Sequence, residues 1–215
     1  MGNYIREPFN GLSHLFGALL SAIALIAMII KVSLEGTTLL SITAILLFGL
    51  SMILLYASSA TYHMVKAKDR VIQFFRRLDH SMIYLLIAGT YAPFCLITLK
   101  GTTGYVLFGI ISFIAISGVL FKMIWFNCPR WVSTALYIGM GWIIVFLASP
   151  LAESLGSQGL FYLILGGVLY TIGGIIYGLK PKISFLKKLG FHEVFHVFIL
   201  LGTSSHFICV YYFVL

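Results

Sequence analysis

Charged side chains are scarce in this sequence. Of its 215 residues, only 9% are Asp, Glu, Lys or Arg, and just 6 are acidic. A soluble domain carries about a quarter charged residues because its surface faces water, so this composition excludes an ordinary soluble protein. Hydrophobic residues instead make up 60% of the chain, and the mean hydropathy is +1.05. These values predict an integral membrane protein.

The sequence is also poor in cysteine and shows no features of a cleavable signal peptide. The 3 cysteines show no paired spacing and no CxxC motif. A disulfide between two of them is the alternative interpretation, but burial among apolar side chains is the favoured role. The first apolar run, from His14 to Ser33, has no small-residue cleavage site followed by a polar region. We therefore expect it to be a membrane span and not a signal peptide.

Seven apolar stretches are long enough to cross a bilayer as helices, which takes about 20 residues each. The predicted spans are residues 14–33, 39–63, 78–98, 103–124, 131–149, 158–178 and 191–214. Charge, Gly or Pro interrupts the chain between them, and the break near Glu153–Gln158 is the least polar. The sequence thus predicts one all-α integral membrane domain over residues 1–215, a seven-transmembrane helix bundle.

The basic residues predict how this bundle is oriented, because Lys and Arg stay on the cytoplasmic side during insertion. Twelve of the 14 lie in the N-terminal segment or in the second, fourth and sixth loops, namely Arg6, Lys66, Lys68, Arg70, Arg76, Arg77, Lys122, Arg130, Lys180, Lys182, Lys187 and Lys188. Only Lys31 and Lys100 fall on the other side. We therefore expect the N-terminus inside and the C-terminus outside, in a multi-pass protein of the cell membrane. The net charge of +8 then reflects topology, so membrane lipids are the expected partners and nucleic acid is not.

Ionisable residues gather at one predicted level of the membrane. Such residues are costly within a span and usually mark a functional site. Those at the cytoplasmic ends of the spans are His14, His63, Asp79, His80, His192, Glu193 and His196. His192 and His196 are four residues apart, so they project from one helix face and suit zinc, for which His63 is a natural third ligand from another span. Binding of lipid headgroups is the alternative role for any one of these histidines.

Two further residues complete the predicted site. Ser59 lies one helical turn before His63, and Asp79 can accept a histidine N–H or hold a metal-bound water. Three protein ligands plus a water are typical of a catalytic zinc site, so Asp79 and Ser59 are the candidate catalytic residues. His206 lies 14 residues beyond His192, about 21 Å along a helix, which is too far to share the metal.

The segment His192-Glu193-Val194-Phe195-His196 also matches the H-E-x-x-H signature of zinc proteases, in which Glu is the general base. Here it lies in the last predicted span, without a soluble protease fold around it. The protease interpretation is therefore disfavoured.

Several short motifs together resemble a known family. They are Glu7-Pro8-Phe9-Asn10 with His14, Ser58-Ser59 with Tyr62-His63, Leu78-Asp79-His80, and His192-Glu193 followed by Phe195-His196. In this order and span position they resemble the hemolysin III family, which belongs with the progestin and adipoQ receptors and is distantly similar to the alkaline ceramidases. The resemblance covers essentially the whole chain.

What the resemblance implies is a seven-helix bundle with its N-terminus inside and zinc on His63, His192 and His196. Asp79 would contact the zinc-bound water, and Ser59 would line the site. The family takes its name from a haemolytic, pore-forming activity attributed to bacterial members. The large extra domain of the animal receptors is missing, so a hormone-receptor role does not carry over.

Two functions of different classes remain open. The first is a zinc-dependent hydrolase of a membrane lipid such as a ceramide-like amide, with Asp79 as the base. The alternative is a non-enzymatic haemolysin, or a regulator of membrane homeostasis, in which zinc is structural. The sequence assigns no role to Glu7, His14, His80, Glu193 or His206.

Overall fold

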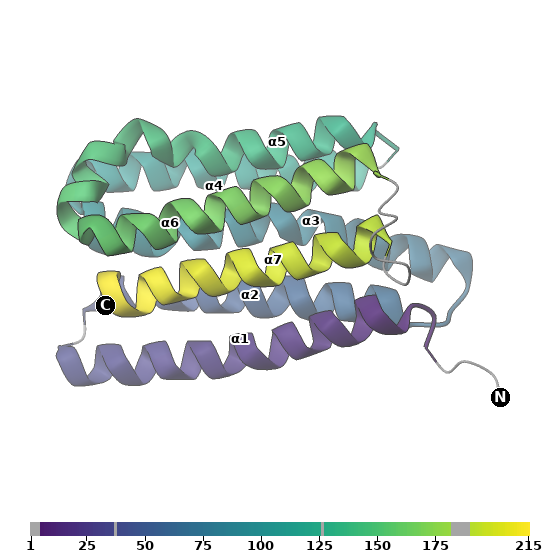
Figure 1. Cartoon of the computed structure of the whole chain (residues 1–215), viewed down its shortest axis with the longest axis horizontal. Helices are drawn as coiled ribbons and strands as arrows, with labels where there is room; N and C mark the ends of the chain where they lie inside the picture. The colour runs from purple at the N-terminus through teal and green to yellow at the C-terminus, as the bar shows by residue number, and fades with distance from the viewer. Residues whose placement is uncertain (1–4, 37, 126, 182–189) are drawn as a thin grey trace.

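The chain folds into an elongated bundle of helices that run side by side along its long axis (Figure 1). The computed structural model describes residues 5–36, 38–125, 127–181 and 190–215, and these contain helices and turns without a strand. The elements are α1 (Pro8–Glu35), α2 (Leu39–Met64), α3 (Asp69–Pro93), η1 (Phe94–Leu99), α4 (Gly101–Ile124), α5 (Arg130–Trp142), η2 (Ile143–Leu147), α6 (Ala148–Leu179), α7 (Phe191–Cys209) and η3 (Val210–Val214). The predicted all-α class is confirmed. Lys182, Lys187 and Lys188, part of the predicted sixth loop, lie outside the described residues.

Within the described residues, six helical segments are long and apolar enough to cross a membrane, not the predicted seven. They are Pro8–Glu35, Leu39–Met64, Asp69–Leu99, Gly101–Ile124, Arg130–Leu179 and Phe191–Val214. The predicted fifth and sixth spans fall within one helical run of 50 residues. The weakly polar break expected near Glu153–Gln158 keeps helical backbone, except that Gly156 has a φ of 66°. Helix α3 begins at Asp69, nine residues before the predicted start of the third span at residue 78.

The 50-residue run folds back on itself. Figure 1 shows α5 and α6 side by side, joined at the end of the bundle opposite the start of α1. Trp142, at the end of α5, donates a hydrogen bond from Nε1 to Thr171 Oγ1 at 2.9 Å. Thr134, near the start of α5, lies against Gly178, near the end of α6. This order of contacts makes the two helices antiparallel.

Local sequence signals explain where several helices begin and end. Pro8 occupies the first turn of α1, where its missing N–H costs no helical hydrogen bond. Thr38 and Ser41 form a reciprocal capping box at the start of α2. Pro93 ends regular α3, and the chain continues through the π-helical turn η1, because proline cannot donate to the preceding turn.

Small residues let the helices approach closely, as expected where lipid supplies no hydrophobic drive between them. A Cβ at Gly89 of α3 would collide with Ser51 of α2, and one at Gly118 of α4 would collide with Tyr84 of α3. Any larger side chain at these two positions would push the paired helices apart.

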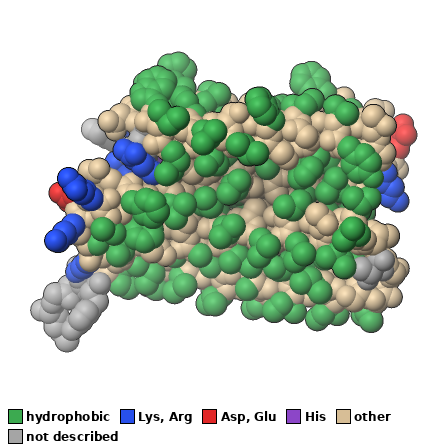
Figure 2. All heavy atoms as spheres, turned by 180° about the vertical axis from the view of Figure 1, so that it is seen from behind, with side chains coloured by type: hydrophobic (Ala, Val, Ile, Leu, Met, Phe, Trp, Pro, Cys, Tyr) green, Lys and Arg blue, Asp and Glu red, His purple; other side chains and the backbone are tan. Residues whose placement is uncertain are grey.

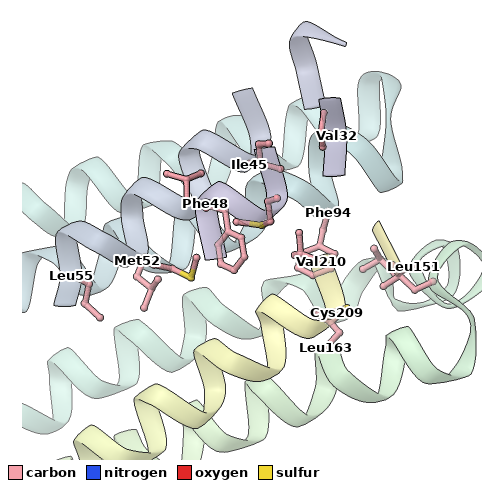
Figure 3. Close-up of a cluster of buried hydrophobic side chains, with 14 of the residues drawn as sticks. Val32, Ile45, Phe48, Met52, Leu55, Phe94, Leu151, Leu163, Cys209 and Val210 are labelled. Atoms are coloured by element: carbon pink, nitrogen blue, oxygen red, sulfur yellow. The ribbon is translucent and has the colours of Figure 1, made fainter. Parts of the chain in front are cut away.

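The largest buried apolar cluster joins the first, second, third, sixth and seventh helices. Figure 3 shows part of it, in which Phe48 of α2 and Phe94 of η1 lie near Val210 of η3, with Leu151 of α6 nearby. Cys95, Cys128 and Cys209 are buried and form no disulfide. Cys95 and Cys209 pack in apolar clusters as predicted, whereas Cys128 contacts the polar side chains of Lys122 and Ser133.

The outer surface matches a membrane environment. Hydrophobic side chains cover the middle of the face in Figure 2, and most of its Lys and Arg side chains gather at one end. Many large apolar side chains are exposed, among them Phe16, Phe113 and Phe146. Such a continuous apolar surface would be unfavourable in water.

Candidate metal centre

Three histidines from two helices meet at one end of the bundle. His63 lies near the end of α2, whereas His192 and His196 lie in the first turns of α7, one turn apart. One ring nitrogen from each can be chosen so that all three atoms lie within 4.8 Å of one another. His63 and His196 are each only 1% exposed, and His192 is half-buried. The structure thus brings together the three residues predicted as metal ligands.

One of the nitrogen spacings matches that expected on a tetrahedral metal ion. Zinc binds histidine nitrogen at about 2.0–2.1 Å, so two ligands on one tetrahedral ion lie about 3.3–3.4 Å apart. The Nε2 atoms of His63 and His192 are 3.3 Å apart. The ring centroids of His192 and His196 are 4.7 Å apart, and those of His63 and His196 are 4.9 Å apart. Three such ligands leave one tetrahedral position to a molecule from outside the set.

Glu7 orients one of the three histidines. Its Oε2 accepts a 2.7 Å hydrogen bond from His63 Nδ1, and its backbone N–H donates to the His63 carbonyl at 3.0 Å. A protonated Nδ1 leaves Nε2 as the free lone pair that a metal requires, which is the usual arrangement of carboxylate, histidine and zinc. Glu7 therefore acts on the site through His63.

The surroundings of Glu7 keep it ionised. Partial burial raises the pKa of its carboxyl, but the hydrogen bonds from His63 and Asn10 and the charge of Arg6 outweigh burial and lower that pKa. Asn10 Nδ2 donates to Glu7 Oε2 at 3.2 Å, and Arg6 Nε lies 3.5 Å from Oε1. The sequence had shown Glu7 only as part of a family motif. Its role appears only when α1 is packed beside the end of α2.

His14 adds a fourth ring to the cluster. It stacks on His196 with centroids 3.6 Å apart and an interplanar angle of 9°, and Tyr56 contacts its edge. His14 supports the position of the His196 ring but is not one of the three grouped ligands.

The two remaining histidines lie outside this cluster. His80 bonds the Tyr177 hydroxyl through Nε2 at 2.8 Å and the Arg76 carbonyl through Nδ1 at 2.8 Å. His206 lies against Tyr170, with ring centroids 5.3 Å apart, and is not among the grouped ligands.

Asp79 and Ser59 lie on the wall of a cavity that also reaches His14, His192 and His196. An oxygen of Asp79 lies 3.4 Å from His80 Nδ1. The Ser59 hydroxyl is buried and interacts with the Asp79 carboxylate. Both residues therefore share a cavity with His192 and His196.

Glu193 faces elsewhere. It lies in the first turn of α7, with its carboxylate close to Gly190, and it is not part of the described cavity wall. This position gives no support to its use as a protease base.

The cavity has a volume of about 370 Å³ and extends from the histidines far along the bundle. His192 and His206 both line it, and they are separated by about 21 Å along α7 at 1.5 Å per residue. Beyond the polar end, most of the wall is formed by Leu, Ile, Phe and other apolar side chains. Its shape and lining suit a long apolar molecule with its polar part at the histidines.

Comparison with known proteins identifies the family. The sequence pattern of the family described as "Haemolysin-III related" matches residues 3–207. "Hemolysin-3" of Bacillus cereus is 41% identical, with 100% of this chain and 95% of that protein aligned. "Hemolysin-3 homolog" of Bacillus subtilis is 39% identical, over 97% of this chain and 94% of that protein.

More distant similarity extends to animals and plants. The human "Monocyte to macrophage differentiation factor" is 22% identical over 77% of this chain and 68% of that protein. "Heptahelical transmembrane protein 4" of Arabidopsis thaliana is 29% identical over 74% of this chain and 45% of that protein. With the family pattern covering nearly its whole length and its apolar helices long enough to span a bilayer, this chain belongs to the haemolysin-III related family of multi-pass membrane proteins.

Proposed function

We propose that this protein is a zinc-dependent hydrolase of membrane lipids, with ceramide-like amides as the first substrates to test. One observation carries the proposal: two members of the three-histidine group, His192 and His196, line a long apolar cavity together with Asp79 and Ser59. An all-histidine ligand set suits zinc better than calcium or magnesium, which prefer oxygen.

The side chains divide the chemistry between them. Zinc, when bound by His63, His192 and His196, would supply Lewis acidity toward a carbonyl and toward water. Asp79 accepts the proton that water loses, for which a carboxylate is a suitable general base. Ser59 donates a hydrogen bond to the polar part of the lipid. The apolar wall holds the acyl chain and keeps it aligned with the bundle.

The proposal includes the topology. We infer that Arg130–Leu179 crosses the membrane twice, as α5 and α6, so that the single domain has seven spans. Fifty residues of helix would be about 75 Å long, more than twice the ~30 Å hydrocarbon core, and the antiparallel contacts of α5 with α6 support two crossings. The name of the Arabidopsis relative, "Heptahelical transmembrane protein 4", agrees with this count.

From the distribution of basic residues in the sequence, we infer that the N-terminus and the metal centre lie on the cytoplasmic side and the C-terminus lies outside.

The test is hydrolysis by an Asp79→Asn variant. Wild type and variant, purified in detergent at equal zinc occupancy, would be given a panel of labelled lipids, ceramides first. An amide cannot accept the proton, so we expect turnover to fall by about 10²–10⁴-fold while the zinc content is kept. Asp69→Asn, at the exposed start of α3, is the matched control and should keep wild-type rates. Equal rates in wild type and Asp79→Asn, or no turnover of any lipid by wild type, would contradict the proposal.

A second candidate function is lysis of membranes without catalysis, or regulation of membrane homeostasis, with zinc joining α2 to α7. The observation that favours it is the name "Hemolysin-3" of a relative that is 41% identical. In this case erythrocyte lysis by purified protein should survive Asp79→Asn and be lost in His63→Ala. Loss of lysis in both variants at equal protein insertion would instead favour a catalytic role.

A further inference from the structure

A second cavity lies next to the candidate metal centre and has a strongly basic wall. Its volume is about 210 Å³, and Arg76 of α3, Lys122 of α4 and Arg130 of α5 all line it. Among the described residues of its wall there is no Asp or Glu. Three basic side chains converge here from three helices, and such a basic pocket favours an anion.

Lys122 is the most informative of the three. It lies in the last turn of α4 and is only 2% exposed. Its Nζ donates to Cys128 Sγ at 3.2 Å and to the hydroxyl of Ser133. Neither partner is a carboxylate, and an ammonium group buried without a counter-charge is strongly unfavourable. A bound anion would supply the missing charge.

Arg130 is held at the same cavity by aromatic side chains. Its guanidinium carbon lies 5.2 Å from the centre of the Tyr177 ring, and the Tyr177 hydroxyl bonds His80 Nε2 at 2.8 Å. Stacking on an aromatic ring positions the planar guanidinium, which can then offer two parallel N–H donors to one anion. The arginine is thus placed before any ligand arrives.

The chemistry of the wall favours phosphate over a single carboxylate. Besides its basic groups, the wall carries Ser133, Cys128 and Asn127, which can donate further hydrogen bonds. A phosphate group presents several oxygens in different directions and carries more charge than a carboxylate, so it can satisfy more of these donors at once.

We propose that this cavity binds a phosphate group, carried by a lipid headgroup or as free phosphate. His80 and Tyr177 line both this cavity and the larger apolar one, so the bound phosphate would lie across that pair of side chains from Asp79. The proposal needs neither zinc nor hydrolysis. It can therefore fail or succeed independently of the proposed enzyme activity.

The test is ligand-dependent thermal unfolding in a neutral, phosphate-free detergent with a chelator present. One arm adds inorganic phosphate at ionic strength matched with sodium chloride. The other adds dioctanoyl phosphatidic acid, with dioctanoylglycerol as the control that lacks the phosphate. Lys122→Met keeps the length of the side chain and removes the charge, while Lys100→Met, at an exposed position, is the matched control.

We expect a rise in the unfolding midpoint for wild type and Lys100→Met. For Lys122→Met we expect binding weakened about tenfold or more, and without ligand this variant should be at least as stable as wild type. Stabilisation by phosphatidic acid alone identifies a lipid headgroup, and stabilisation by inorganic phosphate identifies free phosphate as sufficient. If neither ligand stabilises wild type, or if Lys122→Met responds equally, the proposal is wrong. Should Lys122→Met fail to fold, Arg130→Gln, at a partly exposed position, gives the same comparison.

Discussion

Replacing Glu7 by Gln tests how the metal centre is built, because Glu7 contacts a ligand and not the ion itself. Its carboxylate accepts the 2.7 Å hydrogen bond from His63 Nδ1. Gln keeps the size of the side chain and one acceptor oxygen but removes the charge. His63 would then be a weaker donor of electron density at Nε2, and its ring would be less firmly held.

The expected magnitude follows from this geometry. Loss of an outer partner of a metal-bound histidine lowers metal affinity by about 10–100-fold, which corresponds to about 1.4 to 2.8 kcal/mol. Competition with a chromogenic zinc chelator, at one pH and on purified protein, measures this difference. The number of zinc ions per chain at saturating zinc should stay unchanged, since all three ligands remain.

Glu35→Gln is the matched control because Glu35 is exposed at the far end of α1, where it lies 3.8 Å from Lys31. It should bind zinc as wild type does. Thermal unfolding of the metal-free proteins shows whether Glu7→Gln also loosens the packing of α1 on α2. A zinc affinity within threefold of wild type, in a variant that is stably folded, would refute the role given to Glu7.

Two further predictions concern the ligands and the topology. Alanine at His63, His192 or His196 should reduce the zinc content of the purified protein from about one per chain to near zero, because two histidines alone bind zinc far more weakly. The control variant His206→Ala, outside the group, should keep the wild-type zinc content. Undiminished zinc in His63→Ala would exclude the site as described. A reporter enzyme fused after Leu215 should be active only in its extracytoplasmic form, in line with the basic residues, and cytoplasmic activity at that position would reverse the proposed orientation.

The three-histidine group was predictable from sequence because its evidence is local or depends only on depth. The spacing of His192 and His196 places them on one face of any helix. His63 follows from the rule that ionisable residues at the same membrane level tend to meet. Neither inference requires knowing which helices are neighbours, and the structure confirms that the three meet.

Contacts between helices could not be predicted in this way. Glu7 and His63 are 56 positions apart, and nothing in the sequence places the start of α1 beside the end of α2. Lys122 was interpreted as a loop charge on the cytoplasmic side, whereas the structure buries it against Cys128 and Ser133. The predicted depth of a residue in the membrane does not show which residues on other helices contact it.

The boundary between the fifth and sixth predicted spans was misplaced for a different reason. Sequence patterns separate helices by polar or helix-breaking residues, and the segment between α5 and α6 has few of them. Its backbone reverses through the 3₁₀ turn η2 and the positive φ of Gly156, so an apolar chain turns without leaving helical conformation for long. The sequence alone does not show that Gly156 adopts a positive φ, because glycine occurs in many backbone conformations.

The bundle separates packing from chemistry along its length, and this separation makes the metal-site variants interpretable. Val210, in the large apolar cluster, lies 18 positions beyond His192, or about 27 Å along the seventh helix. Alanine at a metal ligand therefore leaves the contacts among Phe48, Phe94 and Val210 intact. A purely structural zinc would tie α2 to α7 at the polar end, and its loss would lower the unfolding midpoint without needing Asp79. A catalytic zinc requires the Asp79 carboxylate as well. An Asp79→Asn protein that is folded and zinc-loaded but has no turnover is therefore expected for a catalytic zinc and not for a structural one.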